Sequence, residues 1–283
     1  MHARTQYVDP TLRPEVVVLA FVIVALLSTS ISSAFVRAPE AAAASAPLPI
    51  VAPSGSPSAS PVEIAAVAMS TPPPAACPAA PSMAVGDTLV AHAQTANVTV
   101  HSTPSGALVR TLVNPTRDHQ PLHLRVMEKA GRWYRVQMPE RPNSTTGWVL
   151  ADGMTTSRAE HRILIQRCSR TLTLYQGGKP VFSASVAIGK ENTPTPLGDF
   201  YVDFTEKWRP SSPYGPWLIS VTGFSEVYST FGNGGVGQIG IHGTQAETSV
   251  GKPTSNGCIR MHNEDVTRLA SLVVAGTPVL IVD

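Results

Sequence analysis

Residues 239–261 read IGIHGTQAETSVGKPTSNGCIRM and contain a histidine, His242, followed sixteen residues later by a cysteine, Cys258. A cysteine thiol needs a neighbouring base to ionise near neutral pH, because a free thiol titrates a unit or more above it. An imidazole can be that base and need not be close in sequence. The segment therefore predicts a Cys–His pair. Taken alone, the two residues are equally compatible with a buried structural cysteine.

The residues around this pair are suited to binding a substrate. Gly243 and Gly257 let backbone amides approach a reacting carbonyl, so we expect both to help stabilise an oxyanion. Arg260 offers a guanidinium fork to a substrate carboxylate, or to an ion pair that holds the nucleophile loop. Ser255 and Asn256 precede the cysteine and are further candidates for substrate binding.

Short β-type runs flank this segment on both sides. Runs at 163–165, 172–175 and 181–186 are separated by turn signals such as Gly-Gly, which predicts antiparallel strands and a hairpin. One helix is expected over 263–274, with Asn263 as its cap and acidic residues in its first turn. The chain is then expected to end in the strand PVLIV. These patterns predict a mainly β fold with one short helix.

The motifs IGIHGT and SNGCIRMHNEDV, with TPTPLG upstream, resemble the catalytic domain of the L,D-transpeptidase (YkuD) family over 158–283. The resemblance implies a β-sandwich with its site at one end, Cys258 as the acylated nucleophile and His242 as the proton acceptor and donor. It implies no metal and no organic cofactor. Many members have a histidine where Asn256 stands here. An amide takes no proton near neutral pH, which weakens any mechanism with a second histidine.

The same resemblance implies a cell-wall enzyme that cross-links peptidoglycan stem peptides through a cysteine thioester. It also implies acylation by carbapenem-type β-lactams, which would act as inhibitors. Two alternatives remain: an L,D-carboxypeptidase that uses the same residues with water as acceptor, and a catalytically inactive cell-wall-binding protein. The sequence leaves open which diamino acid the natural stem contains.

Residues 85–156 show a second β-rich pattern, with short runs between turn signals every eight to twelve residues. The motifs GRWYRV and TGWVL in this part resemble the end of a bacterial Src-homology-3-like domain, which implies a small β-barrel. Trp133, Tyr134 and Trp148 are expected to fill its core rather than to stack on a ligand. The ligand of this unit, if it has one, is not readable from the sequence.

The N-terminal third has a different composition. Residues 16–36 include the apolar run VVVLAFVIVALL, with residues 1–15 before it as an n-region or cytoplasmic segment. This pattern predicts either a cleaved signal peptide or a signal anchor that contacts the membrane. Residues 37–84 are rich in Ala, Pro and Ser and predict a disordered linker. Either form places the folded part outside the cytoplasm, in the cell wall or periplasmic space.

Charge and cysteine content exclude several classes of function. A net charge of +2 with only 14% charged residues argues against nucleic-acid binding. Three cysteines are too few for a disulfide framework or a zinc site. Cys77 lies in the linker and is expected to be either unimportant or an exposed thiol, and Cys168 is expected to be buried in a strand region. A disulfide between these two is allowed in an oxidising compartment, but nothing in the sequence requires it.

Overall fold

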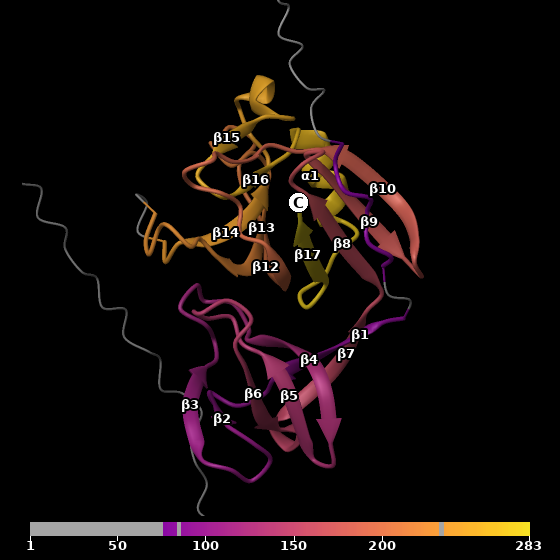
Figure 1. The fold of residues 1–283 in the computed structure, drawn as a ribbon. Coiled ribbons are helices and arrows are strands. Elements are labelled where there is room, and N and C mark those ends of the chain that lie inside the picture. The colour runs from indigo at the N-terminus through magenta and orange to yellow at the C-terminus, as the bar shows by residue number, and fades with distance from the viewer. Residues whose placement is uncertain (1–75, 84–85, 232–234) are drawn as a thin grey trace, which may run out of the picture. The chain divides into compact units, whose positions relative to one another are not determined.

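The computed structural model describes residues 76–83, 86–231 and 235–283. The predicted n-region, the apolar segment and most of the predicted linker therefore lie outside the described residues. No helix in the described ranges is long and apolar enough to cross a membrane. The described chain is mainly β with a single α-helix, α1 (Asn263–Ala270), which confirms the predicted class (Figure 1).

The first seven strands form an antiparallel sheet, called here the N-terminal sheet. They are β1 (Thr88–Ala93), β2 (Asn97–His101), β3 (Leu108–Val113), β4 (His123–Ala130), β5 (Trp133–Gln137), β6 (Thr146–Leu150) and β7 (Met154–Ala159). Their order is β3-β2-β6-β5-β4-β1-β7. A short 3-10 turn, η1 (Ala151–Gly153), joins the last two strands.

Small aliphatic side chains fill the core of the N-terminal sheet, rather than the aromatic residues that were expected there. Val100, Leu124 and Val136 are fully buried in this core. Tyr134 packs against its margin and is only partly buried, and the Trp133 ring packs edge-on against a histidine. Strand alternation explains the difference, because side chains of successive residues point to opposite faces of a sheet.

Eight of the ten remaining strands form a second sheet, called here the C-terminal sheet (Figure 1). They are β8 (His161–Gln166), β9 (Thr171–Gln176), β10 (Lys179–Ser185), β12 (Gly198–Lys207), β13 (Trp217–Phe224), β14 (Gln238–His242), β16 (Ile259–Arg260) and β17 (Pro278–Val282), in the order β10-β9-β8-β17-β12-β13-β14-β16. A separate parallel pair is formed by β11 (Ile188–Gly189) and β15 (Pro253–Ser255), and β15 ends at the first residue of the SNGCIRM segment. A 3-10 turn, η2 (Glu247–Ser249), precedes β15.

The C-terminal sheet curls around one apolar core because β12 belongs to both of its halves. Residues Gly198 to Tyr201 of β12 pair with β17, and Val202 to Lys207 pair with β13. Side chains from both halves and from α1 then meet in a single cluster. The predicted terminal strand is confirmed as β17, which lies parallel to β8 and antiparallel to β12.

The helix is shorter than the predicted range 263–274, and its cap differs. His262 occupies the N-cap position, and the Asn263 side chain makes no capping bond. The Asn263 amide oxygen instead accepts a hydrogen bond from the backbone N–H of Thr244 at 3.0 Å. The helix ends at Ala270, because a turn that leads to Gly276, whose φ of 85° suits glycine, returns the chain to the sheet.

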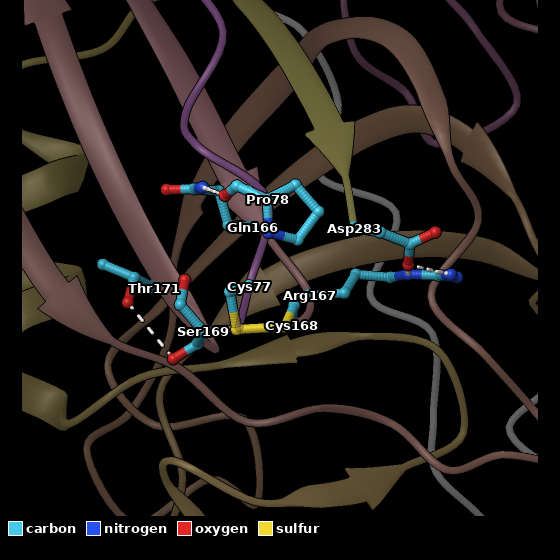
Figure 2. The surroundings of a disulfide bond; sticks show 8 residues. All are labelled: Cys77, Pro78, Gln166, Arg167, Cys168, Ser169, Thr171 and Asp283. Atoms are coloured by element: carbon cyan, nitrogen blue, oxygen red, sulfur yellow. Dashed lines mark hydrogen bonds and ion pairs between the residues drawn. A yellow bond between two sulfur atoms is a disulfide. The ribbon is translucent and has the colours of Figure 1, made fainter. Parts of the chain in front are cut away.

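The C-terminal end of the predicted linker is attached to the C-terminal sheet by a covalent bond. Cys77 forms a disulfide with Cys168, which lies 91 residues later in the turn between β8 and β9 (Figure 2). Pro78 also accepts a hydrogen bond from the Gln166 side chain. The expectation that Cys77 is an exposed thiol is therefore wrong, and Cys168 is only partly buried. The residue sits in a turn rather than a strand, where a distant segment can reach it.

Removing this disulfide is expected to lower the free energy of unfolding by about 2 kcal/mol. In the unfolded chain the bond closes a loop of 91 residues, which removes much conformational freedom. In the folded protein it closes only the short loop between Cys77 and the start of β1 at Thr88, which has less freedom to lose. The difference in closure entropy between loops of these lengths gives this figure. Urea unfolding of the Cys77→Ser/Cys168→Ser variant measures the effect. An unfolding free energy equal to that of the wild type would contradict it.

Candidate active site

Strand pairing brings the histidine and the cysteine of the predicted pair to neighbouring strands. His242 is the last residue of β14, and Cys258 comes directly before β16. The two strands are parallel neighbours, with His242 opposite Arg260. Ile241 and Ile259 form the preceding pair, and before them the Cys258 thiol makes a hydrogen bond with the backbone of Gly240. The intervening residues include η2 and β15, which return the chain from one strand to the other.

His242 is buried as a neutral base. Its side chain is only 4% exposed, and Nδ1 lies 2.6 Å from the carbonyl oxygen of Gly243. A carbonyl oxygen can only accept, so Nδ1 carries the proton and Nε2 keeps its lone pair. Burial lowers the pKa of His242 to about 4; the Gly243 carbonyl acts against this shift, and the charge of Arg260 adds to it. The imidazole is therefore neutral and able to accept a proton at pH 6 to 8.

The Cys258 thiol is protonated in the resting protein. Burial raises its pKa, and a hydrogen bond with the Gly240 backbone and the positive charge of Arg260 lower it only in part. Cys258 is the free cysteine among the residues that the structure describes. A thiol in this state becomes a nucleophile when a base removes its proton during the reaction.

Two aromatic residues extend the site from His242. The ring of Tyr214 packs edge-on against the His242 ring at 4.7 Å between centroids, and Trp208 packs in the same way against Tyr214 at 5.0 Å. Both line a groove of about 370 Å³ that also contains Cys258. This volume falls within the range of small-ligand pockets. Trp217 packs instead against the apolar core.

The residues before the cysteine hold its loop in shape. The Ser255 hydroxyl donates to the carbonyl oxygen of Cys258 at 2.5 Å and accepts from the N–H of Gly257 at 3.1 Å. Ser255 is 1% exposed, so this geometry gives it a positioning role rather than a place in the groove. The Gly257 amide is used within the loop, and Asn256 is exposed.

Sequence reasoning missed two threonines that support this loop from outside. The Thr195 hydroxyl donates to the carbonyl of Gly257 at 2.9 Å and accepts from the N–H of Gly189 at 2.9 Å. The Thr193 hydroxyl donates to the carbonyl of Ser255 at 3.2 Å. Both side chains are buried. They belong to the TPTPLG motif, so the motif was visible in the sequence although its contacts were not.

The matches to known proteins cover the part of the chain that contains this site. Residues 160–281 match the family model of the L,D-transpeptidase catalytic domain, YkuD. YqjB of Bacillus subtilis, which is assigned as an L,D-transpeptidase, is 37% identical over 133 residues, covering 43% of this chain and 70% of that relative. The chain belongs to the L,D-transpeptidase family.

A second relative and a solved structure match a similar part of this chain. YkuD of Bacillus licheniformis, also assigned as an L,D-transpeptidase, is 39% identical over 121 residues, covering 43% of this chain. The matched part of this chain spans 65% of that relative's length. A crystal structure of L,D-transpeptidase 3 from Mycobacterium tuberculosis in complex with a faropenem-derived adduct aligns with a TM-score of 0.36 at 16% identity, covering 51% of this chain and 76% of that one. The N-terminal sheet lies outside the family match, and its resemblance to a Src-homology-3-like domain stays a prediction.

Proposed function

We propose that this protein is a cell-wall L,D-transpeptidase that joins two peptidoglycan stem peptides through a thioester on Cys258. The observation that carries the proposal is the state of the pair. Cys258, a protonated thiol, comes directly before β16, the strand that pairs with β14; His242 at the end of β14 is a buried, neutral imidazole whose Nδ1 carries the proton, which leaves the Nε2 lone pair as the basic site. Family membership supports the same reaction class.

In the first half of the proposed reaction, His242 takes the thiol proton and the Cys258 sulfur attacks the carbonyl before the terminal D-alanine of the donor stem. The tetrahedral intermediate collapses as the C–N bond breaks. His242 returns the proton to the departing amine, so free D-alanine leaves and a thioester remains.

In the second half, the side-chain amine of an acceptor stem attacks this thioester. His242 accepts a proton from the attacking amine, and the C–S bond breaks. The sulfur then recovers that proton, which regenerates the resting thiol. The product is an amide bond between two stems. Water in place of the amine would give hydrolysis, which is the carboxypeptidase alternative.

The other predicted site residues have supporting parts in this proposal. Arg260 places a positive charge close to both members of the pair, where it favours the thiolate and can attract a substrate carboxylate. Backbone amides at Gly243 and at the nucleophile loop would bind the oxyanion, with Gly257 available only if it leaves Ser255. Asn256 is exposed at the loop and can hydrogen-bond to the stem peptide.

The proposal extends to inhibitors and location. Carbapenem-type β-lactams should acylate Cys258, because their strained carbonyl presents the same electrophile as the stem peptide. The chemistry requires no metal or organic cofactor. We also propose that the protein acts outside the cytoplasm, exported by residues 16–36 either as a cleaved signal or as a membrane anchor. N-terminal sequencing of the exported protein distinguishes these two forms.

Product analysis tests the proposed reaction. The purified full chain is incubated with muropeptide tetrapeptides, and the products are followed by mass spectrometry. Cross-linked dimers that have lost one D-alanine are expected. Tripeptide alone would instead indicate a carboxypeptidase. The absence of both products from correctly folded protein would overturn the enzymatic proposal.

Support of the nucleophile loop by Thr195 gives a further prediction. Thr195→Val keeps the shape of the side chain but leaves the Gly257 carbonyl and the Gly189 amide without their partner. We expect dimer formation to slow about tenfold, and stability to fall by about 1 to 3 kcal/mol, the usual effect of an unpaired buried group.

Thr173→Val is the matched control, because the Thr173 hydroxyl lies in β9 and bonds only to Ser183 among the described residues. The initial rate of dimer formation and a urea titration measure the two effects. A Thr195→Val protein with the wild-type rate would show that this hydroxyl does not position the nucleophile.

A further inference from the structure

The groove at Cys258 has walls from both sheets. Glu206 and Trp208 line it from the C-terminal sheet and its following loop. Residues Arg117, Asp118 and His119 line it as well, and they belong to the loop between β3 and β4 of the N-terminal sheet. A segment outside the family match therefore contributes to the surface around the nucleophile.

This loop is braced by its own hydrogen bonds. The Asn114 side chain donates to the carbonyl of Ala93 at 3.1 Å and accepts from the N–H of Leu122 at 2.9 Å, which ties the two ends of the loop to the sheet. Within the loop, the N–H of Thr116 donates to the carbonyl of Gln120 at 2.8 Å. These bonds hold the tip of the loop, residues 117–119, in a defined conformation beside the groove.

The two sheets are also joined by hydrogen bonds, which fixes the loop beside the groove. Arg125 of β4 donates to the Asp199 carboxylate of β12 at 2.6 Å. Asn143 and Phe224 exchange two hydrogen bonds, each 2.9 Å long. The fully buried Tyr201 of β12 donates its hydroxyl proton to a carbonyl of β4. These contacts are partly buried, and separating them would leave their polar groups without these partners.

Arg117 is a charged group with unused donors in this groove. Its side chain is 52% exposed, and its Nε lies 3.6 Å from the Asp118 carboxylate, beyond hydrogen-bond distance. No other partner of its guanidinium occurs among the described residues. Arg117 is also the only arginine or lysine among the described residues that line the groove, where the fixed negative charges are Asp118 and Glu206. Among the described residues that line the groove, Arg117 is therefore the one positively charged side chain that can bind an anionic group of a peptide.

We propose that Arg117 binds a carboxylate of the stem peptide, so that the N-terminal sheet supplies a specificity residue to the catalytic groove. The inference rests on the proposed function, since it takes the stem peptide as the groove's ligand. A guanidinium presents a planar fork that matches a carboxylate with two parallel hydrogen bonds. Arg117 acts on substrate binding and not on the bond-making steps, which belong to the Cys–His pair.

Kinetics of Arg117→Ala in the full chain test this proposal, with Arg158→Ala as the matched control. Arg158 is an exposed arginine of β7 that does not line the groove. For a tetrapeptide with free carboxylates, KM is expected to rise about tenfold in Arg117→Ala, with kcat within twofold of wild type. Arg158→Ala should match wild type. With a tetrapeptide whose carboxylates are amidated, the difference between Arg117→Ala and wild type should disappear.

Binding measurements separate this proposal from the proposed function. Calorimetry with the tetrapeptide compares Cys258→Ala with Cys258→Ala/Arg117→Ala, and the double variant is expected to bind about tenfold more weakly. Equal affinities, or an unchanged KM in an active Arg117→Ala enzyme, would overturn the role of Arg117 and leave the transpeptidase proposal intact. Equal losses with the free and amidated peptides would also overturn it. A folded wild-type protein that binds the peptide without reacting would instead contradict the proposed function.

Discussion

Replacement of Cys258 by alanine is expected to abolish both dimer formation and the covalent adduct with meropenem. The proposed reaction proceeds through a bond to the Cys258 sulfur, so removal of that sulfur leaves no group that can be acylated. A loss of at least about 10⁴-fold in dimer formation is expected, in line with removal of a nucleophile from other enzymes of covalent mechanism. Intact mass spectrometry should show one equivalent of meropenem on wild type and none on Cys258→Ala.

The disulfide-linked cysteines provide the control for this experiment. Cys77→Ser/Cys168→Ser removes two sulfurs and leaves the free thiol in place, so its meropenem adduct should persist. Circular dichroism of Cys258→Ala checks that the fold is retained. Equal labelling of wild type and Cys258→Ala would place the nucleophile at another residue.

His242→Gln is expected to lower kcat about 10²- to 10⁴-fold, the usual contribution of a general base. Glutamine can keep a hydrogen bond in the buried position but cannot take the thiol proton. Asn256, at the position where many members have a histidine, is an exposed amide and cannot take the proton in place of His242. A His242→Gln protein that forms dimers at the wild-type rate would rule out His242 as the base.

The same residue should make the protein less stable in acid. The pKa of His242 is about 4 in the folded protein and near 6.5 in the unfolded chain. Between these values the unfolded chain binds the proton first, so the stabilisation is complete above pH 6.5 and falls as the pH drops towards 4. Roughly 2 to 3 kcal/mol should be lost between pH 7 and pH 4.5. In urea titrations, His242→Gln should lack this part of the pH dependence, and an unchanged slope would contradict the assignment.

The strands could be predicted from local sequence patterns, whereas the end and the cap of the helix could not. Alternating and β-branched runs act locally, so β8, β9 and β17 could be placed from their own residues. The end of α1 could not, because apolar residues with helical spacing continue beyond Ala270 while a tertiary turn redirects the chain. The prediction of Asn263 as the N-cap was wrong for a similar reason: its side chain accepts a hydrogen bond from Thr244, in the loop after His242.

The candidate site was likewise predictable from the sequence only in part. The order of the motifs and their resemblance to the family were enough to nominate His242 and Cys258, whereas the two residue types alone were equally compatible with a buried structural cysteine. Ser255 was nominated for the substrate, yet its buried hydroxyl supports the nucleophile loop. The contact of Thr195 with Gly257 was not predicted, and the Cys77–Cys168 disulfide was allowed by the sequence but not required by it, because each depends on a residue more than sixty positions away.

The sequence by itself therefore predicted the family, which the comparisons confirm, and nominated the residues of the proposed reaction, because both depend on residue types and on their order along the chain. The folded chain alone established the protonation state of His242, which follows from burial and from one carbonyl at Nδ1. It also brought Arg117 from the N-terminal sheet to the groove of Cys258. Such contacts depend on which strands pair and which surfaces pack, and these are long-range outcomes that no local pattern in the sequence encodes.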